Sequence, residues 1–227
     1  MIDVHAHVLP FVDDGAKTVE ESIEMIMELY AKGVTDIVCT PHFSRRFTST
    51  KEEILKSIDL LRDALKKKNL PINLYYGREL YLRESLLKEI TPFSEYTLND
   101  TEYALIEFSF TDYTEIAEYV YELNRRGVKP IVAHFERYDY ANIETALEVK
   151  RAGGLISVNA SSLSLFNIKR RFALKLLSHG LVDLITSDAH YGRKTCIKKA
   201  QNIVKRKLGK NGVESLFELN AKPIIKK

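Results

Sequence analysis

The chain has 227 residues, of which 45% are hydrophobic and 29% are charged, and its formal net charge is +3. These proportions are those of a globular protein and exclude a disordered or fibrous chain. The length predicts one domain spanning residues 1–227. The small net charge does not call for a nucleic-acid partner. No apolar run approaches the roughly 18 residues that cross a bilayer, so we expect no membrane span.

The N-terminus and the cysteines predict a cytoplasmic protein. The opening MIDVHAHV lacks the basic and apolar regions of a signal peptide. Cys39 and Cys196 are the two cysteines, and they form no CxxC pair. They could make at most one disulfide, a usage that suits a reducing compartment.

Seven short runs rich in Ile and Val predict the strands. They are residues 2–4, 36–40, 72–76, 103–108, 130–133, 155–158 and 183–187. Most of these runs do not alternate between apolar and polar residues, which is typical of strands that are buried on both faces.

Amphipathic stretches between these runs predict helices. Three of them open with a capping-box pattern, formed by the pairs Thr18 and Glu21, Thr50 and Glu53, and Asp112 and Glu115. The first of these helices should end at Gly33 and the third at Gly127. Further helices are expected over residues 141–152, 168–179, 194–208 and 213–220. This alternation predicts an α/β fold with a parallel sheet closed into a barrel.

Histidine and acidic residues follow most of the predicted strands. They are His5, His7, His42, Glu79, Glu107, His134, Asp188 and His190. The loops at the carboxyl ends of barrel strands converge on one face, so these side chains should meet there. Each residue alone could be an ordinary polar residue at the end of a strand, but together they exceed what a single zinc ion needs. The sixth run ends at Asn159 and offers no obvious ligand. His179, before Gly180, fits a structural role at a helix end.

Asp13 and Asp14 follow the first strand at a predicted turn that contains Gly15. They could be a turn pair with local hydrogen bonds, or one of them could be a metal ligand. The sequence leaves both readings open.

Residues 39–45, CTPHFSR, have the cysteine-to-arginine spacing of thiol-dependent tyrosine phosphatases. Such a phosphate loop needs backbone amides that converge on the anion. This stretch has no glycine, and Pro41 removes one amide. Cys39 falls within a predicted strand, so we expect it to be buried and inert.

The opening MIDVHAHVLPFVDDGAKTVEES, with His42, Glu79, Glu107, HFER (134–137) and SDAH (187–190), resembles the polymerase-and-histidinol-phosphatase (PHP) superfamily. Within it, the chain resembles the bacterial tyrosine-protein phosphatases of capsule and exopolysaccharide operons, as far as NAKPI near its end. The resemblance implies a distorted (β/α)7 barrel, three divalent metal ions, commonly manganese, and hydrolysis of phosphotyrosine. It also implies a bacterial tyrosine kinase as the phosphoprotein partner and a role in regulating polysaccharide synthesis.

The resemblance also implies which residues would bind each metal ion and which would hold the phosphate. One metal ion would take His5, His7, Glu79 and Asp188, a second Glu79, Glu107 and His134, and a third His42, His190 and Asp14. Arg137 of HFER matches an arginine that holds phosphate in this superfamily. Arg193, in the loop after SDAH, matches a second such arginine more loosely.

The residue chemistry agrees with phosphate ester hydrolysis. A ligand set of imidazoles and carboxylates suits Mn, Fe or Zn. Two cations about 3.5–4 Å apart would lower the pKa of a bridging water, which could attack phosphorus. Arginines could hold the other phosphate oxygens.

The loop at residues 43–50 should lie at the rim of the site. Arg45 and Arg46 could attract an acidic peptide, and Phe43 or Phe47 could stack on a tyrosine ring. The alternative is an ordinary exposed basic loop.

Other functions remain open at this stage. A small-molecule phosphatase of the histidinol-phosphate type and a nucleotide phosphodiesterase could use the same ligands. VDDG (12–15) and the basic aromatic loop favour phosphotyrosine. A non-catalytic metal-binding module would show a broken ligand set, and this ligand set is unbroken.

Overall fold

The computed structural model describes residues 1–226, and all seven predicted runs form strands in it. The strands are β1 (Ile2–Ala6), β2 (Asp36–Cys39), β3 (His42–Phe43), β4 (Asn73–Tyr76), β5 (Glu79–Tyr81), β6 (Tyr103–Glu107), β7 (Lys129–Val132), β8 (Leu155–Asn159) and β9 (Leu184–Thr186). Two short strands were not predicted. Two residues separate the end of β2 from the start of β3, and two residues separate Tyr76, the end of β4, from the start of β5.

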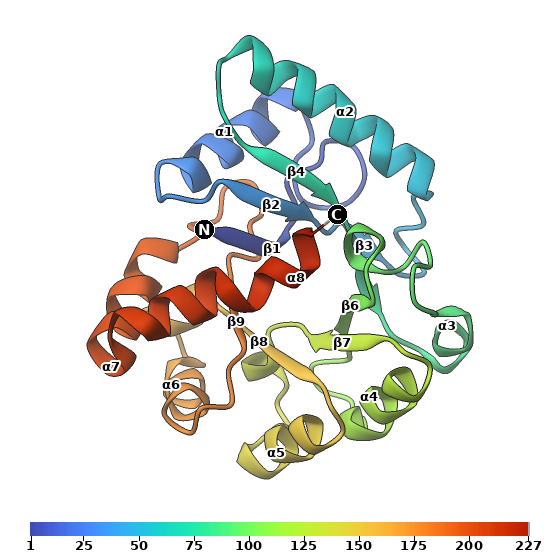
Figure 1. Cartoon of the computed structure of the whole chain (residues 1–227), viewed down its shortest axis with the longest axis vertical. Helices are drawn as coiled ribbons and strands as arrows, with labels where there is room; N and C mark the ends of the chain where they lie inside the picture. The colour runs from blue at the N-terminus through green and yellow to red at the C-terminus, as the bar shows by residue number, and fades with distance from the viewer. Residues whose placement is uncertain (227) are drawn as a thin grey trace.

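All the strand pairs are parallel, and within each of the two sheets the strands follow the order of the chain around a curved wall (Figure 1). β1, β2 and β4 make one sheet, and β3, β5, β6, β7, β8 and β9 make the other. A parallel bridge between Ala6 and Ala189 brings the two ends of the wall together. There Asp188 N donates to His5 O at 2.9 Å, and His7 N donates to Ala189 O at 2.9 Å. The predicted distorted (β/α)7 barrel is confirmed.

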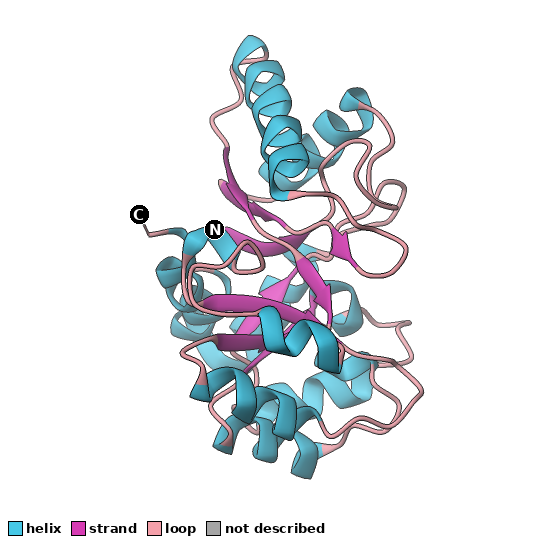
Figure 2. Ribbon diagram, turned by 90° about the vertical axis from the view of Figure 1, so that its right-hand side faces the viewer, coloured by secondary structure: helices cyan, strands magenta, loops and turns pink. Residues whose placement is uncertain are grey.

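Helices surround the strands on the outside of the wall (Figures 1 and 2). They are α1 (Val19–Tyr30), α2 (Lys51–Lys67), α3 (Glu84–Glu89), α4 (Ile116–Arg125), α5 (Ile143–Arg151), α6 (Arg170–Ser178), α7 (Ile197–Phe217) and α8 (Lys222–Ile225). Short 3₁₀ turns occupy Leu98–Asp100, Phe135–Arg137, Ala160–Leu163 and Leu219–Ala221. Within residues 1–226, no helix is both long enough and apolar enough to cross a membrane.

The first residues of the helices show which of the three predicted capping boxes form. Thr50 and Glu53 form the complete capping box at the start of α2. At α1, Thr18 accepts from the backbone N–H of Glu21, whereas the Glu21 carboxylate accepts from Lys17 N. The third predicted start, at Asp112, is wrong. Its carboxylate accepts from the Ser109 hydroxyl at 2.9 Å in a surface turn, and α4 begins four residues later.

The C-terminal region agrees with the prediction except at the helix bounds. Residues 194–208 and 213–220 were expected to form two helices, and α7 (Ile197–Phe217) consists of two helices that meet at a kink at Gly209, where φ is 73°. Helix α3 was not predicted, because six residues are too few to display a helical period.

The apolar side chains form two cores. The larger lies between the wall and its helices. The smaller fills the barrel with side chains of β1, β2, β6, β7 and β9, and Ala221 and Ile224 of the C-terminal segment pack against it. Ile2 and Val4 belong to this inner core, whereas Ala6 belongs to the outer one. An extra residue in β1 relative to β2 between Asp3 and Ala6 explains this change of side.

The capping box of α2 provides a test of this local analysis. We expect Thr50→Ala to lower the free energy of unfolding by about 1 kcal/mol, because the backbone amide of Glu53 loses its acceptor, the Thr50 hydroxyl. Thr48→Ala, a change at an exposed position of the preceding loop, is the matched control. Urea unfolding curves of the two variants measure the difference, and equal stabilities would contradict the assigned cap.

Candidate metal centre

The structure brings all nine predicted ligands together at the carboxyl ends of the strands. Their donor atoms fall into four overlapping groups, and within each group the atoms lie within 4.8 Å of one another. The groups are His7, Asp14, His42 and His190; His5, Glu79 and His134; His5, His7 and Asp188; and His42, Glu79 and Glu107. These groups agree with the expected sharing of Glu79, but they place His42 beside Glu79 and Glu107 as well as beside His190.

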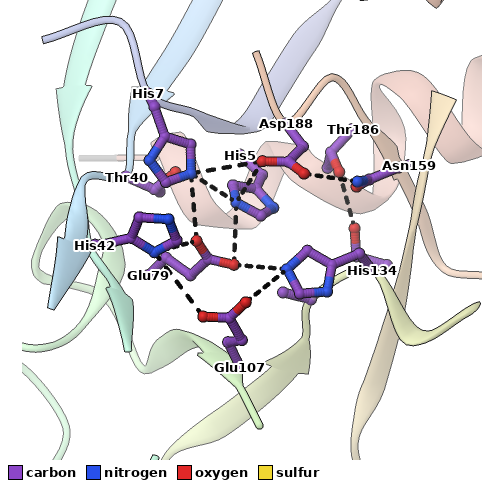
Figure 3. A network of polar contacts seen from close by, with 12 residues as sticks. His5, His7, Thr40, His42, Glu79, Glu107, His134, Asn159, Thr186 and Asp188 are labelled. Carbon is purple, nitrogen blue, oxygen red and sulfur yellow. Dashed lines mark hydrogen bonds and ion pairs between the residues drawn. The ribbon is translucent and has the colours of Figure 1, made fainter. Parts of the chain in front are cut away.

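Glu79 stands at the centre of the cluster (Figure 3). It is the first residue of β5 and is 1% exposed. Its Oε1 lies 2.9 Å from His134 Nε2 and 3.3 Å from His5 Nε2. Its Oε2 lies 2.9 Å from His42 Nδ1 and 3.2 Å from His7 Nε2. One carboxylate therefore faces four imidazole rings that come from different strands and loops.

The contacts within the cluster suit cations better than protons. His5 Nε2 and His7 Nε2 face each other at 3.2 Å. Glu79 Oε2 is buried close to two ring nitrogens, yet it makes no hydrogen bond of acceptable geometry. When lone pairs of nitrogen and oxygen atoms face one another with no hydrogen between them, they repel one another. This repulsion is relieved when cations bind between the atoms. The donors are imidazole nitrogens and carboxylate oxygens, so they fit divalent Mn, Fe or Zn.

The electrostatics of the cluster also favour cation binding. Burial raises the pKa of the Glu79 carboxyl, but the charge on His5 and the hydrogen bond with His134 hold that pKa well below its usual value. Burial and the charge on His7 lower the pKa of His190 to about 4, which leaves its imidazole neutral. Burial also lowers the pKa of His134, but hydrogen bonds to Glu107 and Glu79 raise it to about 10. Metal binding must displace this proton and therefore depends on pH.

Asp13 and Asp14 have different places, which the sequence could not distinguish. Asp13 Oδ2 lies 2.6 Å from His7 Nδ1 and accepts from His42 N at 3.0 Å. Burial raises the pKa of Asp13, but the charge and hydrogen bond of His7 lower it to about 2. Asp14 is half-exposed, and its Oδ1 lies 3.5 Å from His42 Nε2 and 3.6 Å from His190 Nε2. Asp13 thus orients His7, and Asp14 faces the centre.

Two candidate ligands sit on unusual backbone. The φ angles of His134 and Asp188 are 33° and 48°, in the left-handed region that non-glycine residues rarely occupy. His134 lies two residues after the end of β7 and Asp188 two residues after the end of β9, and both side chains point to the centre (Figure 3). Such backbone strain is concentrated at functional sites.

Asn159 is a site residue that the sequence analysis passed over. It ends β8, and its Nδ2 donates to Asp188 Oδ2 at 2.7 Å. Its backbone N–H donates to the buried carboxylate of Glu136 at 3.1 Å. Its position in the sequence could have indicated its role, because Asn159 ends a predicted strand. Every other predicted strand has an acidic or histidine residue near that end.

Arg137 and Arg193 line the same cavity of about 440 Å³ beside Asp188. Arg137 Nη1 lies 3.4 Å from Asp188 Oδ2, and its guanidinium lies 4.2 Å from the centre of the Phe110 ring. Arg193 follows His190 in a tight turn, in which Arg193 N donates to His190 O at 3.1 Å. Both arginines thus lie beside Asp188, a member of the candidate metal cluster.

The four residues of the rim loop differ in their surroundings. Phe47 stacks on His42 with centroids 5.8 Å apart, and the guanidinium of Arg46 lies 5.0 Å from the Phe47 ring. Arg45 is exposed. Phe43 instead packs against the core, with its ring 5.2 Å from Tyr96. Phe47 is therefore better placed than Phe43 to meet a ligand.

Cys39 is fully buried in β2, as predicted. Burial raises the pKa of its thiol far above the usual value. Since the thiolate is the reactive form, this cysteine is unsuited to nucleophilic chemistry.

The contact between Asp13 and His7 leads to a prediction about metal affinity. We expect Asp13→Ala to weaken Mn²⁺ binding by about 10- to 100-fold, because residues that orient a metal-binding histidine commonly contribute this much. Isothermal titration of the folded variant with Mn²⁺ measures the effect. Asp112→Ala, which removes a carboxylate in a surface turn, is the control. An unchanged affinity in Asp13→Ala would contradict the orienting role.

The burial of Cys39 leads to a second prediction. At pH 8 we expect iodoacetamide to leave Cys39 unmodified in the folded protein and to modify it rapidly in urea. Peptide mass spectrometry reads out each site, and the half-buried Cys196 serves as the internal comparison. Rapid modification of Cys39 in the folded protein would return it to consideration as a nucleophile.

Sequence comparison identifies close relatives of this chain. Residues 1–226 match the family described as capsular polysaccharide synthesis, CpsB/CapC. The chain is 35% identical over 239 residues to the tyrosine-protein phosphatase CpsB of Streptococcus agalactiae serotype V, covering 100% of this chain and 98% of that protein. It is 31% identical over 196 residues to the tyrosine-protein phosphatase YwqE of Bacillus subtilis, covering 84% of this chain and 77% of that protein.

Solved structures agree with this relationship. Crystal structures of YwqE from Bacillus subtilis and CpsB from Streptococcus pneumoniae, described as unique metal-dependent tyrosine phosphatases, include a chain that matches with a TM-score of 0.90 and 26% identity, covering 99% of this chain and 94% of that one. Histidinol phosphate phosphatase from Lactococcus lactis shares the fold, with a TM-score of 0.60 at 16% identity, covering 92% of this chain and 95% of that one. The chain therefore belongs to the CpsB/CapC family.

Proposed function

We propose that this protein is a metal-dependent protein-tyrosine phosphatase that hydrolyses phosphotyrosine in proteins. The observation that carries the proposal is the cluster of nine nitrogen and oxygen ligands, one of which, Asp188, lines a cavity together with Arg137 and Arg193. The CpsB and YwqE relatives, which are tyrosine-protein phosphatases, support the same reaction.

Three divalent ions, most readily Mn²⁺ with Fe or Zn as alternatives, are the proposed cofactors. Their ligands would be the nine residues of the cluster, with Glu79 shared between ions. When bound, such ions lower the pKa of water and neutralise charge on phosphate. Glu79, the most central ligand, also holds the surrounding imidazoles in place.

The chain's own residues account for substrate binding in this proposal. Arg137 and Arg193 would hold the phosphate oxygens through charge-assisted hydrogen bonds. Asp188 and Phe110 fix the position of the Arg137 guanidinium. Phe47 and Arg46 would contact the tyrosine ring and its peptide from the side of His42. Tyrosinate, with a pKa of about 10, leaves more readily than an alkoxide, so the reaction does not require a dedicated general acid.

The proposed substrate is an autophosphorylated bacterial tyrosine kinase that controls polysaccharide synthesis. The support for it is membership in the capsular polysaccharide synthesis family. A cytoplasmic location, where both free cysteines stay reduced, is part of the same proposal.

Removal of metal tests the mechanism. We expect a chelator to abolish release of phosphate from a phosphotyrosine peptide, by about a thousandfold or more, and Mn²⁺ to restore it. Cys39→Ala should retain activity, whereas Glu79→Gln should lose it. Activity that survives complete removal of metal would overturn the proposal. Hydrolysis of histidinol phosphate but not of the peptide would favour a small-molecule phosphatase.

A further inference from the structure

The cavity beside Asp188 carries more positive charge than the binding of one phosphate requires. Besides Arg137 and Arg193, its lining includes Lys169 and Lys194, and the only acidic residue in the lining is Asp188. Asp188 belongs to the metal cluster. The outer part of the cavity is therefore lined by cations without a carboxylate among them, an arrangement that attracts anions.

The two lysines differ in how much of their charge is available. Lys169 Nζ lies 2.6 Å from Asp139 Oδ1, so part of its charge is neutralised. Lys194 is exposed and follows Arg193 in the same loop. Within residues 1–226, neither Arg193 nor Lys194 forms an ion pair with an acidic side chain. The uncompensated charge thus lies mainly on the wall formed by Arg193 and Lys194.

The opposite wall has a defined shape. It is the segment between β8 and α6, in which Asn167 Oδ1 accepts from Lys169 N at 2.9 Å and Asn167 Nδ2 donates to Ser161 O at 3.2 Å. Arg170 Nε donates to Leu163 O at 3.2 Å. These hydrogen bonds order the backbone around Lys169 and keep this residue at the cavity.

The outer rim of this wall is strongly apolar. Leu165, Phe166 and Ile168 are 70%, 94% and 92% exposed, respectively, and Ile168 also lines the cavity. Three large apolar side chains in one short loop are unusual on a free surface. Inorganic phosphate or a small phosphate ester would make little use of them, whereas a polypeptide that enters the cavity would cover them.

We propose that the outer part of this cavity, which we call the lysine pocket (Lys169 and Lys194), binds an acidic side chain beside the phosphotyrosine of the substrate. The proposal rests on the proposed phosphatase function and names its substrate class, a phosphotyrosine peptide with an adjacent aspartate, glutamate or second phosphotyrosine. An extended peptide spans about 3.3–3.6 Å along its length for each residue. A phosphate held by Arg137 and Arg193 therefore places the next side chains within the same cavity.

The lysine pocket is distinct from the basic rim loop. Arg45 and Arg46 follow His42, whereas the pocket begins at Asp188 and Asn159, and Figure 3 shows His42 on the other side of the centre from Asn159. The two basic regions would therefore contact the peptide on opposite sides of the phosphotyrosine. The lysine pocket belongs to a cavity that adjoins the candidate metal cluster at Asp188.

Paired peptides test the pocket in the metal-loaded enzyme. One phosphotyrosine peptide carries glutamates on both sides of the phosphotyrosine, and its partner carries glutamines there. The readout is the ratio of kcat/KM for the acidic peptide to that for the neutral one, which cancels effects on the chemical step. We expect the wild-type ratio to exceed one and to fall by about threefold in Lys194→Gln and further in the double variant with Lys169→Gln, because partly exposed ion pairs contribute modestly. The preference should also shrink at high salt.

Reversal of charge sharpens the test. In Lys194→Glu, a peptide with lysines beside the phosphotyrosine should become the better substrate, a result that a merely structural role of Lys194 would not produce. Lys66→Glu, an exposed position on α2, is the matched control and should keep the wild-type preference. Equal ratios in wild type, Lys194→Gln and Lys194→Glu would overturn the lysine pocket while leaving the phosphatase intact. Failure of the wild type to hydrolyse any phosphotyrosine peptide would instead overturn the proposed function.

Discussion

Four imidazole rings converge on the carboxylate of Glu79, a buried group at the upper end of the barrel interior. A carboxylate in this position is stable only if its charge is compensated, and the rings that compensate it come from segments far apart in the chain. The buried ring nitrogens in turn need a partner, which is either the carboxylate or a bound cation. The whole centre is therefore one interdependent unit, in which the loss of any member leaves the others with uncompensated groups.

Interruptions in the strands allow the centre to form. β4 ends at Tyr76 and β5 begins at Glu79, and a Cβ at Gly77 would lie 2.7 Å from Val38 Cγ1. Only glycine fits at this break, which lets the chain turn and point Glu79 inward. Similarly, a Cβ at Gly15 would lie 2.1 Å from His7 O. This close approach brings the Asp13 turn against His7. The barrel is distorted at the places where it must position ligands.

The site has two different flanks. On the side of His42, an aromatic ring and exposed arginines lie at the rim. On the side of Asp188, a cavity lined by arginines and lysines continues from the centre. The proposed metal ligands would account for cleavage of a phosphate ester, but they would not select among phosphate esters. Selectivity must come from the flanks, and their charge and apolar surface suit a polypeptide better than a small metabolite.

The sequence by itself determined seven of the nine strands found in residues 1–226, the barrel and the identity of most of the clustered residues. Short runs rich in Ile and Val separated by amphipathic segments favour a parallel sheet closed into a barrel, whose loops bring His5, His42, His134 and Asp188 to one face. The local signal failed where a competing contact existed, as at Asp112, whose carboxylate bonds to Ser109. It also failed for Asn159, since an amide at a strand end has no distinctive pattern.

Only the tertiary structure decided which role each of two nearby residues of the same type has. Asp13 and Asp14 are adjacent carboxylates, yet the turn at Gly15 directs one to His7 and leaves the other facing His42 and His190. Phe43 and Phe47 lie in one loop, yet one packs into the core and the other stacks on a candidate ligand. The physical reason is that these roles depend on contacts between residues distant in the chain, and no local pattern of residue types encodes such contacts.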